Sequence, residues 1–155
     1  MTLQKICILG AGTLGSRVAL QAAISGFTVT LFDLRQASLD SANLTMQKIL
    51  RQLVRAGNLT ESQVPAILQR VQPTLDLSQA LKGAYLVNES VTEDVTIKKA
   101  LWTQVGQLAD TNTWLTTNTS YLLPSQFAEE TGRPQQFCAF HFHDVFYSRV
   151  VDIMP

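Results

Sequence analysis

The sequence of 155 residues lacks any apolar run near the roughly 20 residues that a membrane-spanning helix needs. It also lacks an excess of either charge, with 12 basic and 12 acidic residues. Such a balance gives no electrostatic reason to expect binding to nucleic acid or to an anionic membrane. No signal-peptide pattern precedes the first apolar stretch. We therefore expect a protein of the cytoplasm whose partners are small molecules.

Cysteine is scarce, and the two that are present, Cys7 and Cys138, both fall in apolar, strand-like runs. We interpret them as buried thiols of a reducing compartment, not as a disulfide or a metal-binding pair. The sequence gives no reason to expect a metal site. Repeats, low-complexity tracts and linkers are also missing, so the length predicts one domain over residues 1–155.

Three glycines, Gly10, Gly12 and Gly15, follow a short apolar run at residues 6–9 with the spacing G-x-G-x-x-G. In a strand–turn–helix unit, the first glycine permits the tight turn out of the strand. The second lets the backbone approach a pyrophosphate, and the third lets the helix pack closely on the sheet. A helical pattern follows at once, so this stretch predicts a dinucleotide-binding turn.

The start of that helix, at Thr13 and Leu14, would aim N–H groups and a partial positive charge at the phosphates. A second apolar run, residues 27–32, ends in Asp33, close to the spacing expected for an acid that binds the ribose hydroxyls. Such an acid repels a 2′-phosphate and therefore favours NAD over NADP. Arg35 keeps NADP as an alternative, and a glycine-rich turn of another α/β protein is the less specific interpretation.

Strand-like and helical patterns alternate along the rest of the chain, which predicts an α/β fold with a doubly wound parallel sheet of the Rossmann type. A helical pair is inserted after the second strand, and its second helix is expected to run from Thr60 to Val71 and to end at Pro73. A helix over 95–108 is expected to bury Ile97, Leu101 and Val105. Further strands are predicted at 84–87, 114–117 and 137–142, and short helices at 76–83 and from Leu123.

Polar clusters, at residues 88–94 and 118–120, follow two of these strands at the sheet edge where ligands bind in open α/β folds. At the carboxyl end of the last strand, His141 could take a proton from an alcohol while hydride leaves the carbon. A carboxylate such as Asp152 could hold the imidazole tautomer. A buried histidine with only a packing role is an equally good interpretation from composition alone. We expect His143 to lie on the other face of the strand, as a structural or rim residue.

Several motifs in one order give the chain a specific resemblance. They comprise the glycine turn with its acid; Val87, Glu89, Val91 and Glu93, with Lys98 five residues further on; Thr117-Asn118-Thr119-Ser120; and His141-Phe142 twenty residues after that serine. With the helical pair, this pattern resembles the NAD-binding domain of the 3-hydroxyacyl-CoA dehydrogenase family. It is especially similar to the diketoreductase and λ-crystallin-like branch, over nearly the whole chain.

The resemblance implies that His141 is the general acid/base and that Ser120 and Asn118 hydrogen-bond the substrate oxygen. Glu93 and Lys98 would border the nicotinamide end of NAD. Turn and cap chemistry alone would also explain Asn118 and Ser120. An ordinary charged helix start would also explain Glu93 and Lys98.

Two departures from the family pattern stand out. The usual His-Phe-Phe-Asn-Pro becomes His141-Phe-His-Asp-Val145, and the orienting acid is Asp152, eleven residues after the histidine, where the family has glutamate twelve residues after it. Both favour a divergent member with a hydroxyacyl or keto substrate other than a standard fatty acyl-CoA. Family members also continue with a helical domain, so we expect a truncated domain, with a homodimeric full-length parent.

The sequence therefore predicts an NAD-dependent oxidoreductase that interconverts a secondary alcohol beside a carbonyl and the corresponding ketone. The residues 1–155 alone are expected to be inactive. The alternative is a module that binds NAD(H) without turnover. A related β-hydroxyacid or imine reductase is a weaker alternative, because such enzymes rely on a lysine in a later helix.

Overall fold

The computed structural model describes residues 4–148 and 150–154, so five residues of the predicted domain (1–3, 149 and 155) lie outside the described part. The strands are β1 (Lys5–Leu9), β2 (Thr28–Phe32), β3 (Val71–Thr74), β4 (Leu86–Glu89), β5 (Trp114–Thr117), β6 (Phe137–Phe142) and β7 (Val151–Met154). The α-helices are α1 (Thr13–Ile24), α2 (Gln36–Arg55), α3 (Val64–Gln69), α4 (Leu77–Leu81) and α5 (Val95–Leu108). Short 3-10 helices are η1 (Glu61–Gln63), η2 (Pro124–Gln126), η3 (Glu129–Thr131) and η4 (Pro134–Gln136).

The strands form one sheet in the order β3-β2-β1-β4-β5-β6-β7. All neighbours are parallel except β6 and β7, which are antiparallel. The order reverses between β1 and β4, and ligands of open α/β sheets bind outside the carboxyl ends of strands at such a switch point. The predicted doubly wound Rossmann-type sheet is confirmed.

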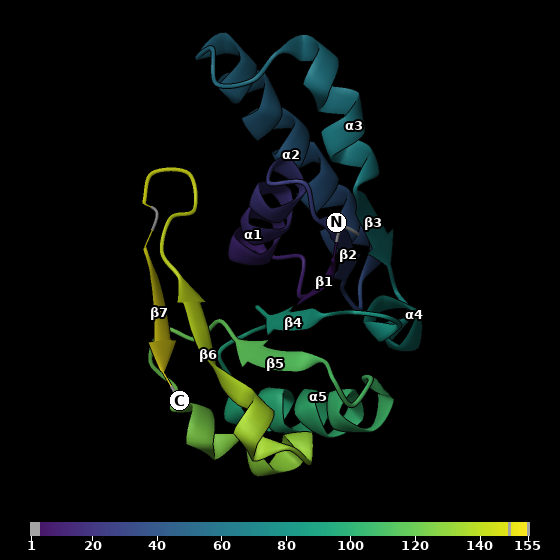
Figure 1. Ribbon diagram of the computed structural model, residues 1–155, viewed down its shortest axis with the longest axis vertical. Coiled ribbons are helices and arrows are strands. Elements are labelled where there is room, and N and C mark those ends of the chain that lie inside the picture. The colour runs from purple at the N-terminus through teal and green to yellow at the C-terminus, as the bar shows by residue number, and fades with distance from the viewer. Residues whose placement is uncertain (1–3, 149, 155) are drawn as a thin grey trace.

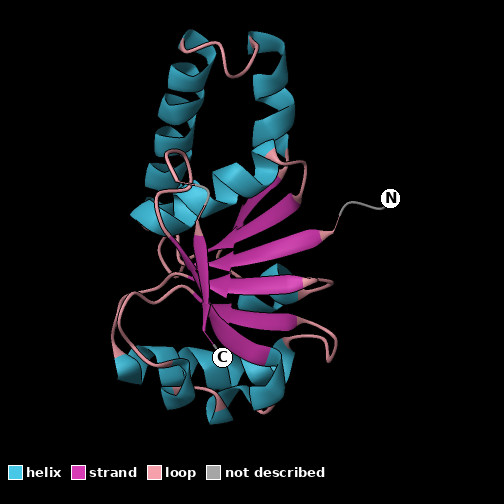
Figure 2. Ribbon diagram, turned by 60° about the vertical axis from the view of Figure 1, so that its left-hand side comes forward, coloured by secondary structure: helices cyan, strands magenta, loops and turns pink. Residues whose placement is uncertain are grey.

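Two groups of helices cover the sheet from opposite sides (Figure 1). Helices α1, α2 and α3 with η1 lie on one side, and α4 and α5 with η2, η3 and η4 on the other, while the strands fan out between them (Figure 2). Each face of the sheet has its own hydrophobic core, and alternate side chains of β1 contribute to the two. Ile8 packs in the core beside α1 and α2, and Cys7 and Leu9 pack in the core beside α5. This alternation is the period of two that a strand imposes.

The inserted helical pair after the second strand is present as α2 and α3, which extend together beyond the sheet (Figure 2). A capping box begins the second of these segments. The Thr60 backbone N–H donates to Gln63 Oε1 at 2.8 Å, and the Thr60 side chain accepts from the Gln63 backbone. Such a reciprocal cap satisfies amide groups that a helix start leaves free.

The end of this pair differs from the prediction. The helix ends at Gln69, and Val71–Thr74 forms β3, paired in parallel with β2. We predicted a helix through Val71 that Pro73 would end. Pro73 lies in a strand at the sheet edge, the position where the missing N–H of proline is tolerated. The apolar spacing fitted both structures, and only pairing with β2 distinguishes them.

Two other boundaries also differ. The strand predicted at 84–87 is shifted to Leu86–Glu89, and β7, at Val151–Met154, was not predicted.

The buried face of α5 is rotated relative to the prediction. Lys98, Trp102 and Val105 are buried, whereas Ile97 is 49% exposed. The rotation follows from a buried lysine, which an apolar pattern cannot reveal.

Both cysteines are free thiols, as predicted. Cys7 is buried, and burial raises its pKa to about 12, while Cys138 is only partly buried. Among residues 4–148 and 150–154, no helix is long and apolar enough to cross a membrane.

Helix α5 packs so closely on η3 that only glycine fits at position 106. A Cβ added at Gly106 would lie 2.4 Å from the backbone oxygen of Thr131. Gly106→Ala, which would stabilise an exposed helix by about 1 kcal/mol, is therefore expected to lower the free energy of unfolding by about 1–3 kcal/mol. Urea unfolding measures this change, with the exposed neighbour Gln107→Ala as control. An unchanged or higher stability of Gly106→Ala would contradict this packing.

Candidate active site

The glycine turn packs directly on the loop that follows β4. Gly10 has a φ of +102°, and a Cβ there would lie 2.6 Å from the Ser90 carbonyl oxygen. A Cβ on Gly15 would lie 2.0 Å from the carbonyl oxygen of Gly10, so the helix starts against the turn itself. A Cβ on Gly12, in contrast, would meet no atom of the described residues within 4 Å. Gly12 thus leaves a cradle open at the switch point.

The first turn of α1 faces this cradle without a side-chain cap. Gly12 is its N-cap residue, makes no side-chain hydrogen bond, and is followed by no acidic residue in the first turn. The amide groups of Thr13 and Leu14 are in that turn, where the helix leaves N–H groups unpaired. An anion such as a pyrophosphate satisfies those groups and the helix dipole together.

Asp33 lies at the end of β2, beside the glycine turn. Its carboxylate accepts the Ala11 backbone N–H at 2.9 Å and the Arg35 backbone N–H at 3.0 Å. A cleft of about 470 Å³ opens between the turn and the start of α2, lined among others by Gly12 and Arg35. Asp33 is therefore held where the spacing placed an acceptor for ribose hydroxyls.

Glu93 joins the loops after β4 and β5. Its carboxylate accepts the Thr119 hydroxyl at 2.9 Å and the Ser120 backbone N–H at 3.0 Å. Asp94 caps the next helix by accepting the Ile97 backbone N–H at 2.9 Å. The side chain of Glu93 keeps 26% of its surface exposed, so it borders the open edge of the sheet.

Lys98 lies beneath this loop, with no exposed side-chain surface. Its ammonium donates to Glu89 Oε1 at 2.6 Å and lies 3.5 Å from Glu93 Oε2. Glu89 is also fully buried, and accepts the Thr117 hydroxyl at 2.6 Å and the Val91 backbone N–H at 2.8 Å. Lys98 therefore holds Glu93 from below, and the buried pair with Glu89 was not predicted. Its only sequence signal is an acid that follows a short apolar run and Asn88 at the end of the strand.

Asn118 ties three strand ends together. Its Nδ2 donates to Ser90 Oγ at 3.0 Å, and its Oδ1 accepts the Phe142 backbone N–H at 2.9 Å. The Asn118 backbone N–H donates to the Glu89 carbonyl at 2.7 Å. The amide side chain is buried, and one Nδ2 hydrogen is left over from the bonds among described residues.

His141 emerges beside Ser120, which follows the neighbouring strand. The imidazole Nε2 lies 3.2 Å from Ser120 Oγ, and the His141 side chain is 16% exposed. Its other nitrogen, Nδ1, lies 3.5 Å from Asp152 Oδ2. Antiparallel pairing of β6 with β7 sets this contact, because His141 and Asp152 are directly opposed. The structure thus brings Ser120, His141 and Asp152 into one row.

The His143 side chain lies on the same face of β6 as His141, contrary to the prediction that it lies on the opposite face. Side chains at i and i+2 of a strand share a face, and the two imidazole centroids lie 5.0 Å apart. His143 Nε2 lies 2.8 Å from Asp152 Oδ2, closer than His141. The His143 hydrogen bond, followed by that of His141, holds the pKa of the Asp152 carboxyl below its usual range.

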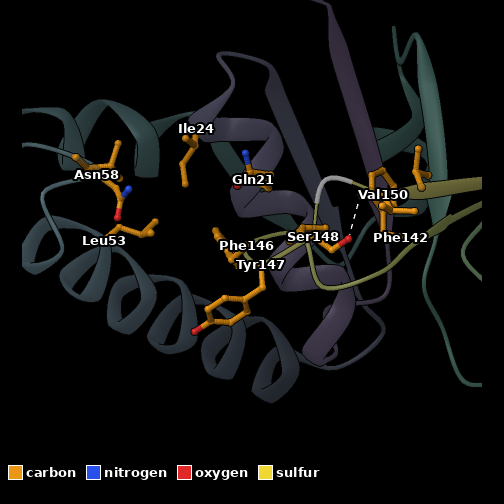
Figure 3. Close-up of a pocket in the computed structure, with 12 residues that line it drawn as sticks. Gln21, Ile24, Leu53, Asn58, Phe142, Phe146, Tyr147, Ser148 and Val150 are labelled. Atoms are coloured by element: carbon orange, nitrogen blue, oxygen red, sulfur yellow. Dashed lines mark hydrogen bonds between the residues drawn. The ribbon is translucent and has the colours of Figure 1, made fainter.

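The opposite face of β6 carries a separate cleft of about 550 Å³, lined by α1, the end of α2 and the β6–β7 connection (Figure 3). Phe142 lines it, and none of the site residues above does. Arg17 anchors the β6–β7 connection by binding both Asp144 carboxylate oxygens, at 2.8 and 2.7 Å, and by stacking on Phe146 at 5.1 Å. This cleft is therefore distinct from the row around His141.

Together the sheet order, the glycine turn and Asp33 define a Rossmann-type dinucleotide-binding domain. Residues 5–155 match the family described as 3-hydroxyacyl-CoA dehydrogenase, NAD binding domain. The chain belongs to the 3-hydroxyacyl-CoA dehydrogenase family, and the part it represents is the domain that binds NAD.

Known relatives agree with this assignment. The chain is 32% identical over 135 residues to the fatty acid oxidation complex subunit alpha of Idiomarina loihiensis. The matched region covers 87% of this chain and 19% of that protein. A solved diketoreductase is 34% identical, with a TM-score of 0.91 over 99% of this chain and 55% of its own. The 3-hydroxybutyryl-CoA dehydrogenase of Escherichia coli K12 is 30% identical, with a TM-score of 0.91 over 99% of this chain and 32% of its own.

The chain thus spans about a fifth of the first relative, about a third of the Escherichia coli chain and just over half of the diketoreductase chain. The residues present fit NAD, because the uncapped helix start and the open space at Gly12 suit a pyrophosphate. Asp33 suits a ribose without a 2′-phosphate.

The buried ion pair yields a stability prediction. Lys98→Met leaves the Glu89 carboxylate buried without its counter-ion and should lower the free energy of unfolding by about 3–5 kcal/mol. Lys99→Met is the control, because Lys99 is 46% exposed in its pair with Glu130 and such pairs contribute about 0–1 kcal/mol. Chemical denaturation measures both variants. Equal, small effects would show that Lys98 is not the counter-ion of Glu89.

The glycine turn yields a binding prediction. Gly12→Ala should fold normally and bind NADH at least about tenfold more weakly, a loss of about 1.4 kcal/mol, because the methyl fills the pyrophosphate cradle. Gly15→Ala should instead destabilise the fold, since its Cβ meets backbone. Calorimetric titration with NADH, beside thermal unfolding, separates the two. Undiminished NADH binding by Gly12→Ala would place the pyrophosphate elsewhere.

Proposed function

We propose that this domain serves an NAD-dependent oxidoreductase that interconverts a secondary alcohol next to a carbonyl and the corresponding ketone. Family membership supports the oxidoreductase class. The observation that carries the finer proposal is the row of Ser120, His141 and Asp152, with Nε2 of His141 3.2 Å from the serine hydroxyl. The row lies at the same edge of the sheet as the glycine turn, because β1, β4, β5 and β6 are parallel.

His141 is the proposed general acid/base. When Asp152 accepts the hydrogen on Nδ1, Nε2 is left with a lone pair that can take the proton of a substrate hydroxyl. A positioned base of this kind contributes a rate factor of roughly 10²–10⁴. When bound, NAD supplies the hydride chemistry. In the reverse direction His141 returns its proton to the ketone oxygen.

The neighbouring groups are proposed to position this base and the substrate. Ser120 would hydrogen-bond the substrate oxygen, and Asn118 has one Nδ2 hydrogen for the same purpose. Asn118 also fixes the strand that carries His141, by its bond to the Phe142 backbone N–H. Glu93, held from below by Lys98, would face the nicotinamide end of NAD.

The substrate class is proposed from the relatives together with the departures in this chain. The matched diketoreductase acts on dicarbonyl compounds, and the Escherichia coli enzyme is a 3-hydroxybutyryl-CoA dehydrogenase. Both names describe an alcohol or ketone near a second carbonyl. His143, Asp144 and Asp152 stand where the family has Phe, Asn and a more distant Glu. They favour a hydroxyacyl or keto substrate other than a standard fatty acyl-CoA. We also propose that a full-length parent forms a homodimer.

A second candidate is an NAD(H)-binding module without turnover. The specific observation in its favour is that Asp152 lies nearer to His143, at 2.8 Å, than to His141, at 3.5 Å. A carboxylate engaged with His143 orients His141 less firmly, which weakens the proposed base.

His141→Gln tests the proposal, because glutamine retains a polar side chain and cannot take the proton. NADH oxidation is followed in the full-length parent, because residues 1–155 alone are expected to be inactive, with acetoacetyl-CoA and with a β-diketo ester. Turnover should fall by roughly 10²–10⁴-fold, with NADH affinity within about twofold of the unchanged chain. Loss of NADH affinity to the same extent would contradict the acid/base role. Tight NADH binding by the unchanged full-length parent with no turnover of either substrate would favour the binding module.

A further inference from the structure

Two histidines and one carboxylate converge where β6 meets β7. The candidate ligand atoms of His141, His143 and Asp152 all lie within 4.8 Å of one another. His143 Nε2 is 2.8 Å and His141 Nδ1 is 3.5 Å from the same oxygen, Asp152 Oδ2. This is the spacing of a metal site, since tetrahedral ligands about 2.1 Å from a zinc ion lie roughly 3.4 Å from one another.

The backbone places these groups without strain. His-x-His on a strand presents both imidazoles on one face, and antiparallel pairing puts Asp152 directly opposite His141. The side chains of His143 and Asp152 are 45% and 49% exposed, so they can rotate inward to a common ion and admit water as a fourth ligand. His141 comes from the more buried side, with 16% exposed.

We propose that His141, His143 and Asp152 bind one divalent transition-metal ion of the Zn²⁺ class. Imidazole nitrogens with one carboxylate suit zinc, cobalt or nickel, whereas magnesium and calcium prefer sites made of oxygen ligands alone. No sequence spacing predicts this site, because Asp152 is not in the same strand as the two histidines. His141 and Asp152 meet only through the β6–β7 pairing.

Metal at this site would also switch off the proposed base, a consequence that rests on the proposed function. The ion takes Nδ1 of His141 and displaces Asp152 from it. The ring hydrogen of the neutral imidazole is then on Nε2, the nitrogen that faces Ser120 Oγ. Nε2 then has no lone pair for the proton of the substrate hydroxyl. Zn²⁺ is thus expected to inhibit alcohol oxidation while sparing NADH binding.

The binding test is direct, because the sequence contains only these two histidines. The chain, purified without a histidine tag, is titrated with Co²⁺ and Zn²⁺ by visible absorption and calorimetry. One Co²⁺ per chain is expected, with the absorption bands of imidazole-coordinated cobalt. Excess Zn²⁺ should displace it and excess Mg²⁺ should not.

Matched variants assign the ligands. Asp152→Asn and His143→Gln should each weaken Zn²⁺ binding by about tenfold or more, at least the loss seen when groups behind metal ligands are removed. Asp144→Asn is the control, because that exposed carboxylate is next to His143 in sequence but binds Arg17. No binding at millimolar metal, or equal loss in Asp152→Asn and Asp144→Asn, would overturn the site.

The inhibition is tested separately in the full-length parent by following NAD reduction with 3-hydroxybutyryl-CoA, the direction in which His141 acts as the base. Saturating Zn²⁺ should lower the rate of the unchanged protein at least about tenfold. The rate of His143→Gln with Zn²⁺ should stay close to its rate without Zn²⁺. Turnover that persists with the site filled would overturn the switch. Metal binding with the expected variant pattern, but no turnover in the absence of metal, would overturn the proposed function and leave the metal site supported.

Discussion

The Glu89 carboxylate is the interaction on which the site's architecture depends. It ends β4 with no exposed surface and binds the Lys98 ammonium, the Thr117 hydroxyl and the Val91 amide. A buried charge is stable only when it is paired and hydrogen-bonded. The need to satisfy this one group therefore fixes the start of α5, the end of β5 and the loop after β4 relative to one another.

From that fixed loop, contacts extend to both halves of the proposed active site. The Ser90 backbone packs against Gly10 of the glycine turn. The Ser90 hydroxyl oxygen accepts a hydrogen bond from the Asn118 side-chain amide. Asn118 in turn holds the Phe142 backbone N–H, one residue from His141. The glycine turn and the strand that carries the proposed base, His141, are thus linked through Ser90 and Asn118. A shift in either loop would move the base relative to the cofactor.

Much of this arrangement follows from local sequence patterns. The glycine spacing, the apolar run before it and Asp33 each reflect a requirement of one turn, so they predicted the fold and the cofactor. Pairing between distant segments was harder. Val71–Thr74 looked like the end of a helix because its apolar spacing suits either structure, and β7 became a strand only through β6. The partners of Lys98 and His143 depend on those pairings too, which is why a buried ion pair and a second imidazole were not foreseen.

The central claim is that NAD spans from the glycine turn to His141, and a crystal structure of the chain with NADH tests it most directly. We predict that the pyrophosphate lies against Gly12 and the first turn of α1, and that Asp33 accepts the ribose hydroxyls. The nicotinamide ring should lie beside Glu93 and His141. A nicotinamide ring bound away from His141, with the phosphates still at Gly12, would contradict the proposed acid/base role. Phosphates bound elsewhere would contradict the assignment of the cofactor site itself.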